Sequence, residues 1–114
     1  MRKPGDLYHR FIHLCLAAEK LSDLPALSLV ENRILSLLSM YWSTHQPITV
    51  VESMKIASDI STSTVFRHLK SLRSKGYVEL VVDEVDNRIK YVTPADLTAN
   101  YFDMMGESII KAMK

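Results

Sequence analysis

Apolar positions follow helical spacing along most of the chain and switch to strand-like spacing in its later part. The stretch 6–21 is apolar on nearly every side, and a helix of that kind has to be covered on more than one side. From Ser28 to Tyr41 apolar residues recur every three or four positions, which predicts a second helix ending near His45. A last helical pattern runs through residues 97–113.

Three helices are predicted to open with a capping box, in which a Ser or Thr and an acidic residue three positions later satisfy free backbone amides. The pattern occurs at Ser28–Glu31, at Thr49–Glu52 and at Thr93–Asp96. In the third case Pro94 would occupy the first helical position, where proline is favoured. We therefore expect the last helix to begin directly after Thr93.

The short helix at the second capping box leads through a tight turn into a longer helix, for which Ser61 is a suitable N-cap. In the longer helix Val65, Leu69 and Leu72 share one face. Gly76 provides a C-cap, because glycine readily adopts the left-handed conformation that closes many helices. A short helix, a turn and a second helix form the helix-turn-helix motif, whose second helix enters the major groove of DNA.

A β-hairpin is predicted directly after this motif. The runs 77–83 and 88–92 are rich in β-branched and aromatic residues, and polar residues including Asp86 and Asn87 separate them. The predicted fold class is therefore mainly α with a small β-hairpin wing, a winged helix-turn-helix.

Composition indicates one globular domain, residues 1–114, with 47% hydrophobic residues to build a core. The stretch 1–6 lacks the apolar segment of a signal peptide, and no apolar run approaches the ~18 residues that span a bilayer. Cys15 is the only cysteine, which excludes an internal disulfide and suits a reducing compartment. We expect a cytoplasmic protein that does not contact membranes.

The net charge of +1 hides a local asymmetry. Residues 61–76 contain four cations and a histidine but no acid, whereas residues 79–86 contain four acids and no base. A charged run is often only a solvated face, and that interpretation stays open. The position of the basic run on the second helix of a helix-turn-helix favours DNA binding instead.

The burial of one face of this helix predicts which side chains are offered to DNA. They form two rows on the opposite side: Ser63, Arg67, Lys70 and Ser74 in one, and Thr64, His68, Ser71 and Lys75 in the other. Small hydroxyls in the first turn would let the helix end approach the groove, and Arg67 and His68 could reach base edges, with Arg67 matching the paired acceptors of guanine. Cations further along would hold phosphates. The candidate DNA-binding residues of the helix are Ser61, Thr62, Ser63, Thr64, Arg67, His68, Lys70, Arg73 and Lys75.

Asn87 and Arg88 complete the candidate set, because they are predicted at or near the tip of the wing. Arginine is attracted to the negative potential of a narrow minor groove. An ion pair between Arg88 and Asp86 is the alternative. The ion pair and the minor-groove contact are compatible if Asp86 orients the guanidinium.

These residues together resemble the MarR-type winged-helix regulators. The resemblance covers roughly Ser28 to Thr93 and rests on the Ser/Thr-rich helix start, Arg67, the Lys-Gly-aliphatic close, the Asp-x-Arg wing and the Val-Thr pair after it. It implies DNA contacts from the helix at Ser61–Arg67 and from Arg88 of the wing. It also implies a homodimer in which residues 6–22 and 94–113 form dimerisation helices around a winged core, 28–93. The sequence departs from the family where Pro-Ala-Asp follows Thr93 instead of a glycine, and in its length, which is nearer that of SarA-like or PadR-like relatives.

The resemblance thus predicts a dimeric, sequence-specific regulator of transcription, a repressor, that binds double-stranded DNA. A protein-interaction module of the same fold is the rival, favoured by the acidic run and the near-neutral total charge, and a replication or partition factor is a third alternative.

No phosphate-binding glycine loop or nucleophile motif is present, so we expect neither catalysis nor a cofactor. His9 and His13 form only an incomplete metal site, and Cys15 beside leucines is expected to be unreactive. A small-molecule effector stays open without sequence support.

Overall fold

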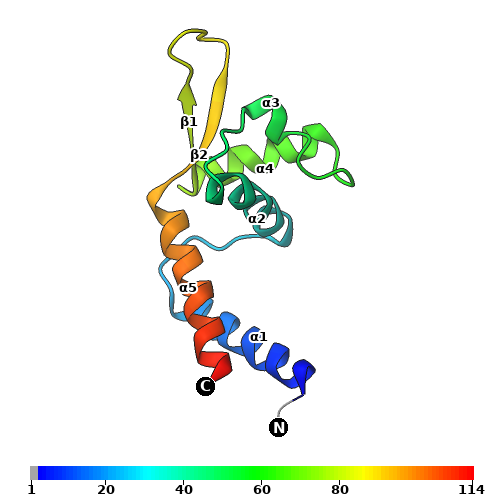
Figure 1. Ribbon diagram of the computed structural model, residues 1–114, viewed down its shortest axis with the longest axis vertical. Coiled ribbons are helices and arrows are strands. Elements are labelled where there is room, and N and C mark those ends of the chain that lie inside the picture. The colour runs from blue at the N-terminus through cyan, green and yellow to red at the C-terminus, as the bar shows by residue number, and fades with distance from the viewer. Residues whose placement is uncertain (1–2) are drawn as a thin grey trace. The chain divides into compact units, whose positions relative to one another are not determined.

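The computed structural model describes residues 3–114, so the first two residues of the stretch 1–6 lie outside the description. The chain forms two compact units (Figure 1). One consists of the residues up to Ala26 together with Leu97–Lys114, and the other is Leu27–Asp96.

The predicted mixture of helices and one hairpin is confirmed. The order of elements is α1 (Pro4–Leu21), α2 (Leu29–Ser43), α3 (Val50–Ser53), α4 (Thr62–Ser74), β1 (Val78–Val82), β2 (Lys90–Pro94) and α5 (Asp96–Met113).

The core of the unit Leu27–Asp96 lies where α2, α4 and the hairpin meet. The inward residues of α4 predicted from spacing are all buried, and they share the core with three residues of α2 and three of the hairpin segment. These buried residues are Val65, Leu69, Leu72, Ile34, Leu35, Leu38, Tyr77, Val78 and Val92. Burial of apolar surface of this extent is the main force that fixes the packing of the helices.

The hairpin is antiparallel, with Val78 opposite Pro94 and Val82 opposite Lys90. On the other edge of β2 an isolated bridge joins Thr49 to Tyr91, and the Val92 amide donates to the Ile48 carbonyl at 2.9 Å. The strand β2 is therefore held on both edges, which ties the wing to the segment that precedes α3.

Two of the three predicted capping boxes are confirmed. At α2 the Glu31 amide donates to Ser28 Oγ at 3.1 Å, and the Ser28 amide donates to Glu31 Oε1 at 2.8 Å. At α3 the same pair of bonds joins Thr49 and Glu52 at 3.1 and 3.0 Å. The short helix expected after this capping box spans four residues.

The third predicted capping box is wrong. Thr93 and Pro94 are the last residues of β2, opposite Glu79 and Val78, and α5 begins only at Asp96. The hydrogen bonds to β1 continue beyond the proline, because the Ala95 amide donates to the Tyr77 carbonyl at 3.0 Å. Pairing with β1 therefore outweighs a local capping pattern, and the expected helix 94–113 starts two residues later.

The second unit contains α1 and α5. Cys15 of α1 and Tyr101, Ser108 and Ala112 of α5 are buried, and Arg10 Nη2 donates to the Lys111 carbonyl at 3.2 Å. Burial raises the pKa of the Cys15 thiol, and a hydrogen bond with Ser108 only partly offsets this effect. A raised pKa keeps the thiol protonated and less nucleophilic, in line with the unreactive cysteine predicted from sequence.

Large apolar side chains nevertheless remain exposed on both helices of this unit: Tyr8, Leu16, Leu21, Ile109, Ile110 and Met113. Among the described residues no helix combines the length and the apolar character needed to cross a membrane. His9 and His13 are both exposed, and within residues 3–114 no group of three side chains suited to a metal ion occurs.

Candidate nucleic-acid interface

The start of α4 is built by three hydroxyls. Ser61 is the N-cap, as predicted, and its Oγ accepts from the Thr64 amide at 3.2 Å while it donates to Thr64 Oγ1 at 2.7 Å. Ser63 Oγ lies 3.3 Å from the Ser61 hydroxyl. Thr62 is exposed beside them. The helix ends before Gly76, whose φ of 89° is the left-handed C-cap conformation expected there.

The outer row of α4 is exposed, opposite the buried apolar face. It carries Ser63, Arg67, Lys70 and Ser74, each separated from the next by three or four residues. This is one of the two rows that the sequence predicts for contact with DNA. Two of the four side chains are cations, and among the described residues no acid lies on α4.

The second predicted row is half-buried, and its last two members bind α2. It consists of Thr64, His68, Ser71 and Lys75. Lys75 Nζ donates to Glu31 Oε1 at 2.7 Å, and Ser71 Oγ donates to Glu31 Oε2 at 2.6 Å. This end of the row therefore faces a neighbouring helix rather than open solvent, which favours a structural role for Lys75 over the phosphate contact expected from sequence.

On its other flank α4 faces the wing across a groove. The cavity has a volume of about 600 Å³ and lies between α3, α4 and the hairpin. Its walls include Val51, Phe66, Leu80 and Ile89, and four cations also line it: Lys70, Arg73, Arg88 and Lys90. Lys70 Nζ lies 4.6 Å from the centroid of the Phe66 ring, which places the ammonium over the aromatic face. Phe66 was not among the residues singled out from the sequence.

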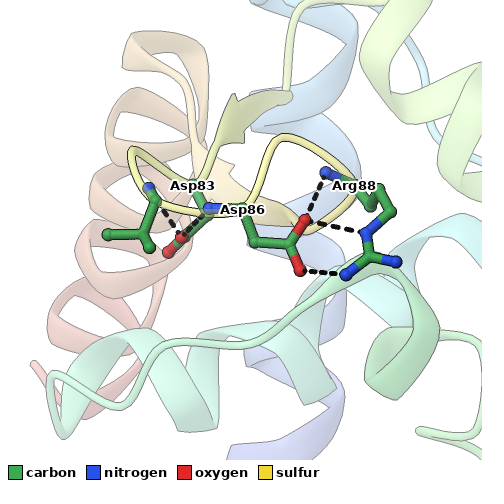
Figure 2. A network of polar contacts seen from close by, with 4 residues as sticks. Asp83, Asp86 and Arg88 are labelled. Carbon is green, nitrogen blue, oxygen red and sulfur yellow. Dashed lines mark hydrogen bonds and ion pairs between the residues drawn. The ribbon is translucent and has the colours of Figure 1, made fainter.

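Two aspartates organise the turn at the tip of the wing (Figure 2). Asp83 Oδ2 accepts from the amides of Val85 at 3.1 Å and Asp86 at 2.9 Å. Asp86 in turn accepts from Arg88 Nε and Nη2, both at 3.0 Å, and from the Arg88 amide at 3.0 Å. The side-chain hydrogen bond to Arg88 lowers the pKa of Asp86, and the amide bonds lower that of Asp83.

The ion pair predicted for Arg88 is thus present, and it leaves the guanidinium accessible. The Arg88 side chain is 90% exposed, so pairing with Asp86 fixes its direction without covering it. Asn87 is exposed beside it. Two of the four acids of the wing are therefore engaged in its turn, and Glu79 and Glu84 remain as exposed negative charges close to the candidate interface.

No protein-family model matches the sequence, and no curated protein matches it. Solved structures do. A transcriptional regulator from Thermotoga maritima superposes with a TM-score of 0.65 at 16% identity, over 94% of this chain and 72% of that one. A mutant MarR from E. coli complexed with operator DNA gives 0.60 at 21% identity, over 90% and 68% of the two chains. The heme sensor protein PefR from Streptococcus agalactiae, in complex with heme, gives 0.59 at 18% identity, over 99% and 80%.

Identities this low carry information about fold rather than about activity. The match nevertheless extends over most of this chain, including the helices outside the winged core. The chain has the winged-helix fold of the MarR-type regulators.

Proposed function

We propose that this protein is a regulator of transcription, a repressor without catalytic activity, that binds double-stranded DNA as a homodimer. In this proposal α4 enters the major groove and the wing lies beside the adjacent minor groove. The observation that carries it is the outer row of α4, which is exposed, lacks acids and contributes Lys70 to the groove that Arg88 of the wing also lines.

Within that row Ser63 and Arg67 are the proposed readers of base edges, since they lie nearest the helix start. Lys70 and Arg73 would hold phosphates, and Arg88, directed by Asp86, would reach the minor groove. The hydroxyls of Ser61 and Thr62 would contact the backbone at the helix start. Thr64 and His68, which are half-buried, would contribute from the side of the helix.

The exposed apolar side chains of α1 and α5 support the dimer. Six large apolar residues of these helices are at least half exposed or close to it, from 49% for Ile109 to 88% for Leu21. Large apolar side chains exposed in such number on two helices suit burial against another chain. We propose that α1 and α5 together form the two-fold interface.

Selection of bound sequences from a pool of random duplexes tests both parts of the proposal. A two-fold motif with half-sites about one helical turn apart is the result expected from a dimer with two α4 helices. No enrichment, together with no retention on a heparin column, would support the rival protein-interaction module, to which the exposed Glu79 and Glu84 are better suited.

Arg67→Ala and Lys70→Ala are expected to weaken DNA binding in different ways. Loss of Arg67 should cost ~1–3 kcal/mol and relax the preference at one base pair, because a bidentate contact to a base is removed. Loss of Lys70 should weaken binding to all duplexes alike and reduce the salt dependence by about one unit, because one phosphate contact is lost. Anisotropy titrations at several salt concentrations measure both effects. Unchanged affinity of both variants would contradict the assignment of the outer row to DNA contact.

The groove between α4 and the wing supports a second proposal, an effector site for an amphipathic organic anion. Its walls are largely apolar, and its thirteen lining residues include four cations and no acid. Such a lining suits a ligand with an apolar body and a carboxylate or sulfonate group. PefR is a heme sensor, so a relative in fold responds to an amphipathic ligand. Since Lys70 and Arg88 line the groove, an occupant would compete with DNA.

A fluorescent probe of this chemistry, anilinonaphthalene sulfonate, tests the groove. Leu80→Glu places a negative charge in it and should abolish the fluorescence enhancement, whereas Val81→Glu, on the opposite face of β1, should leave it unchanged. Both variants add the same charge to the same strand. Equal enhancement in the two variants would place the probe elsewhere.

A further inference from the structure

Glu31 is a buried carboxylate that joins two helices. Only 3% of its surface is exposed, although Glu is rarely buried unless it is paired. Its Oε1 accepts from the Ser28 amide at 2.8 Å and from Lys75 Nζ at 2.7 Å. Its Oε2 accepts from Ser71 Oγ at 2.6 Å. One side chain thereby caps α2 and binds both Ser71 of α4 and Lys75, the C-cap residue of α4.

Ser71 and Lys75 are four positions apart, about one helical turn, on the same flank of α4 and its C-cap. Two bonds at this spacing oppose both a rotation of α4 about its axis and a slide along α2. The apolar contacts between α2 and α4 cannot do this as sharply, because hydrophobic contact is not directional. Hydrogen bonds to a charged group are short and directional, and they are stronger in a buried environment.

The rotation of α4 about its axis decides which side chains face outward. Ser63, Arg67 and Lys70 lie in the outer row only while the row with Ser71 and Lys75 is turned towards α2. A rotation by one residue, 100°, would bring a different row to the surface. Glu31 thus acts on the outer row without being part of it.

We infer that Glu31 is a positioning residue for α4, which sets the orientation of the outer row and thereby its discrimination between DNA sequences. The inference rests on the proposed DNA binding. Glu31 itself lies at the amino end of α2, and its carboxylate accepts hydrogen bonds from Ser28, Ser71 and Lys75.

The chain contains a matched control for this role. Glu52 occupies the same capping-box position at α3 and makes the same bond to its N-cap amide, at 3.0 Å. Glutamine is compatible with that position of a capping box, so Glu31→Gln and Glu52→Gln both keep a cap and both remove one negative charge. The two variants differ in what else they change. Glu31→Gln also removes the charge that binds Ser71 and Lys75, whereas the carboxylate of Glu52 binds the amide of Thr49 within its own cap.

The test compares three full-length proteins on the selected duplex and on an unrelated duplex of equal length. Glu31→Gln should bind the selected duplex about 2- to 30-fold more weakly, in the range of coupling between sites that do not touch. Its affinity for the unrelated duplex and its salt dependence should match those of Glu52→Gln. Equal losses on both duplexes, or equal losses in both variants, would overturn the positioning role.

Hydrogen exchange of the α4 amides, measured without DNA, separates this inference from the proposed function. Exchange over residues 68–74 should be faster in Glu31→Gln than in wild type and unchanged in Glu52→Gln, because the attachment to α2 is weakened. Ser71→Ala, which removes one of the two bonds and keeps the ion pair, should show a smaller change of the same kind. Unchanged exchange in Glu31→Gln and Ser71→Ala would overturn the inference, whereas a wild-type protein that binds no duplex would overturn the proposed function.

Discussion

Shortening Leu72 to alanine is expected to lower the free energy of unfolding of the Leu27–Asp96 unit by about 2–5 kcal/mol. The Leu72 side chain is completely buried, at 0% exposure, on the inner face of α4. Its removal loses the free energy of transferring apolar surface out of water and leaves a cavity that the core can only partly close. A loss of this size is a large share of the stability of a small domain. The variant should therefore unfold at a lower temperature than the wild-type protein, and its DNA binding should be lost at that temperature.

Urea unfolding followed by tryptophan fluorescence measures this loss. Trp42 is the only tryptophan, it is half-buried, and its Nε1 donates to the Val92 carbonyl at 3.0 Å, so its emission reports on the same unit. Met40→Ala provides the control, since the side chain is 65% exposed and its truncation should change stability by no more than about 0.5 kcal/mol. Similar losses in the two variants would show that the inner face of α4 is not the core of the unit.

Acid is expected to remove about 3 kcal/mol of stability through Glu31 alone. Burial disfavours its charged form, but the hydrogen bonds from Lys75, Ser71 and Ser28 outweigh burial and lower its pKa from 4.5 to about 2. A group whose pKa is lower in the folded state stabilises that state most when both states are ionised. The contribution is therefore complete above pH 4.5 and is lost as the pH falls towards 2, at roughly 1.4 kcal/mol for each pKa unit.

Comparison with Glu31→Gln isolates this contribution. Hydrogen bonds also lower the pKa values of Asp59, Asp83 and Asp86, so acid weakens the wild-type protein and the variant through these groups in the same direction. The difference in unfolding free energy between the two proteins should be largest at neutral pH and should shrink between pH 4.5 and pH 2. A difference that stays constant over this interval would mean that Glu31 is not held ionised by α4.

Local patterns predicted most of the fold. The capping boxes at α2 and α3, the N-cap Ser61, the buried face of α4 and the left-handed Gly76 all depend on residues within a few positions of one another. Local hydrogen bonds and helical periodicity are properties of the sequence itself, so such features can be read from it. The prediction failed at Thr93, where the competing partner, β1, lies fourteen residues earlier in the chain.

Part of the candidate interface could also be predicted. The outer row of α4 and the pairing of Arg88 with Asp86 follow from residue types and spacing, and both are present. Glu31 was recognised only as a capping residue. Its hydrogen bond with Ser71 could not be predicted, because the two residues are forty positions apart and no local pattern connects them.

The sequence alone determined that α4 has one apolar face and a basic, hydroxyl-rich remainder, because the 3.6-residue period fixes which side chains share a side of a helix. Periodicity alone predicted that the two rows on this polar side, which begin at Ser63 and at Thr64, are equally exposed to solvent. Only the tertiary structure decided between them, since α2 covers one flank through Glu31 while the outer row stays exposed. The physical reason is that a helix pattern specifies directions around its own axis, whereas the packing of other elements specifies which of those directions end in solvent.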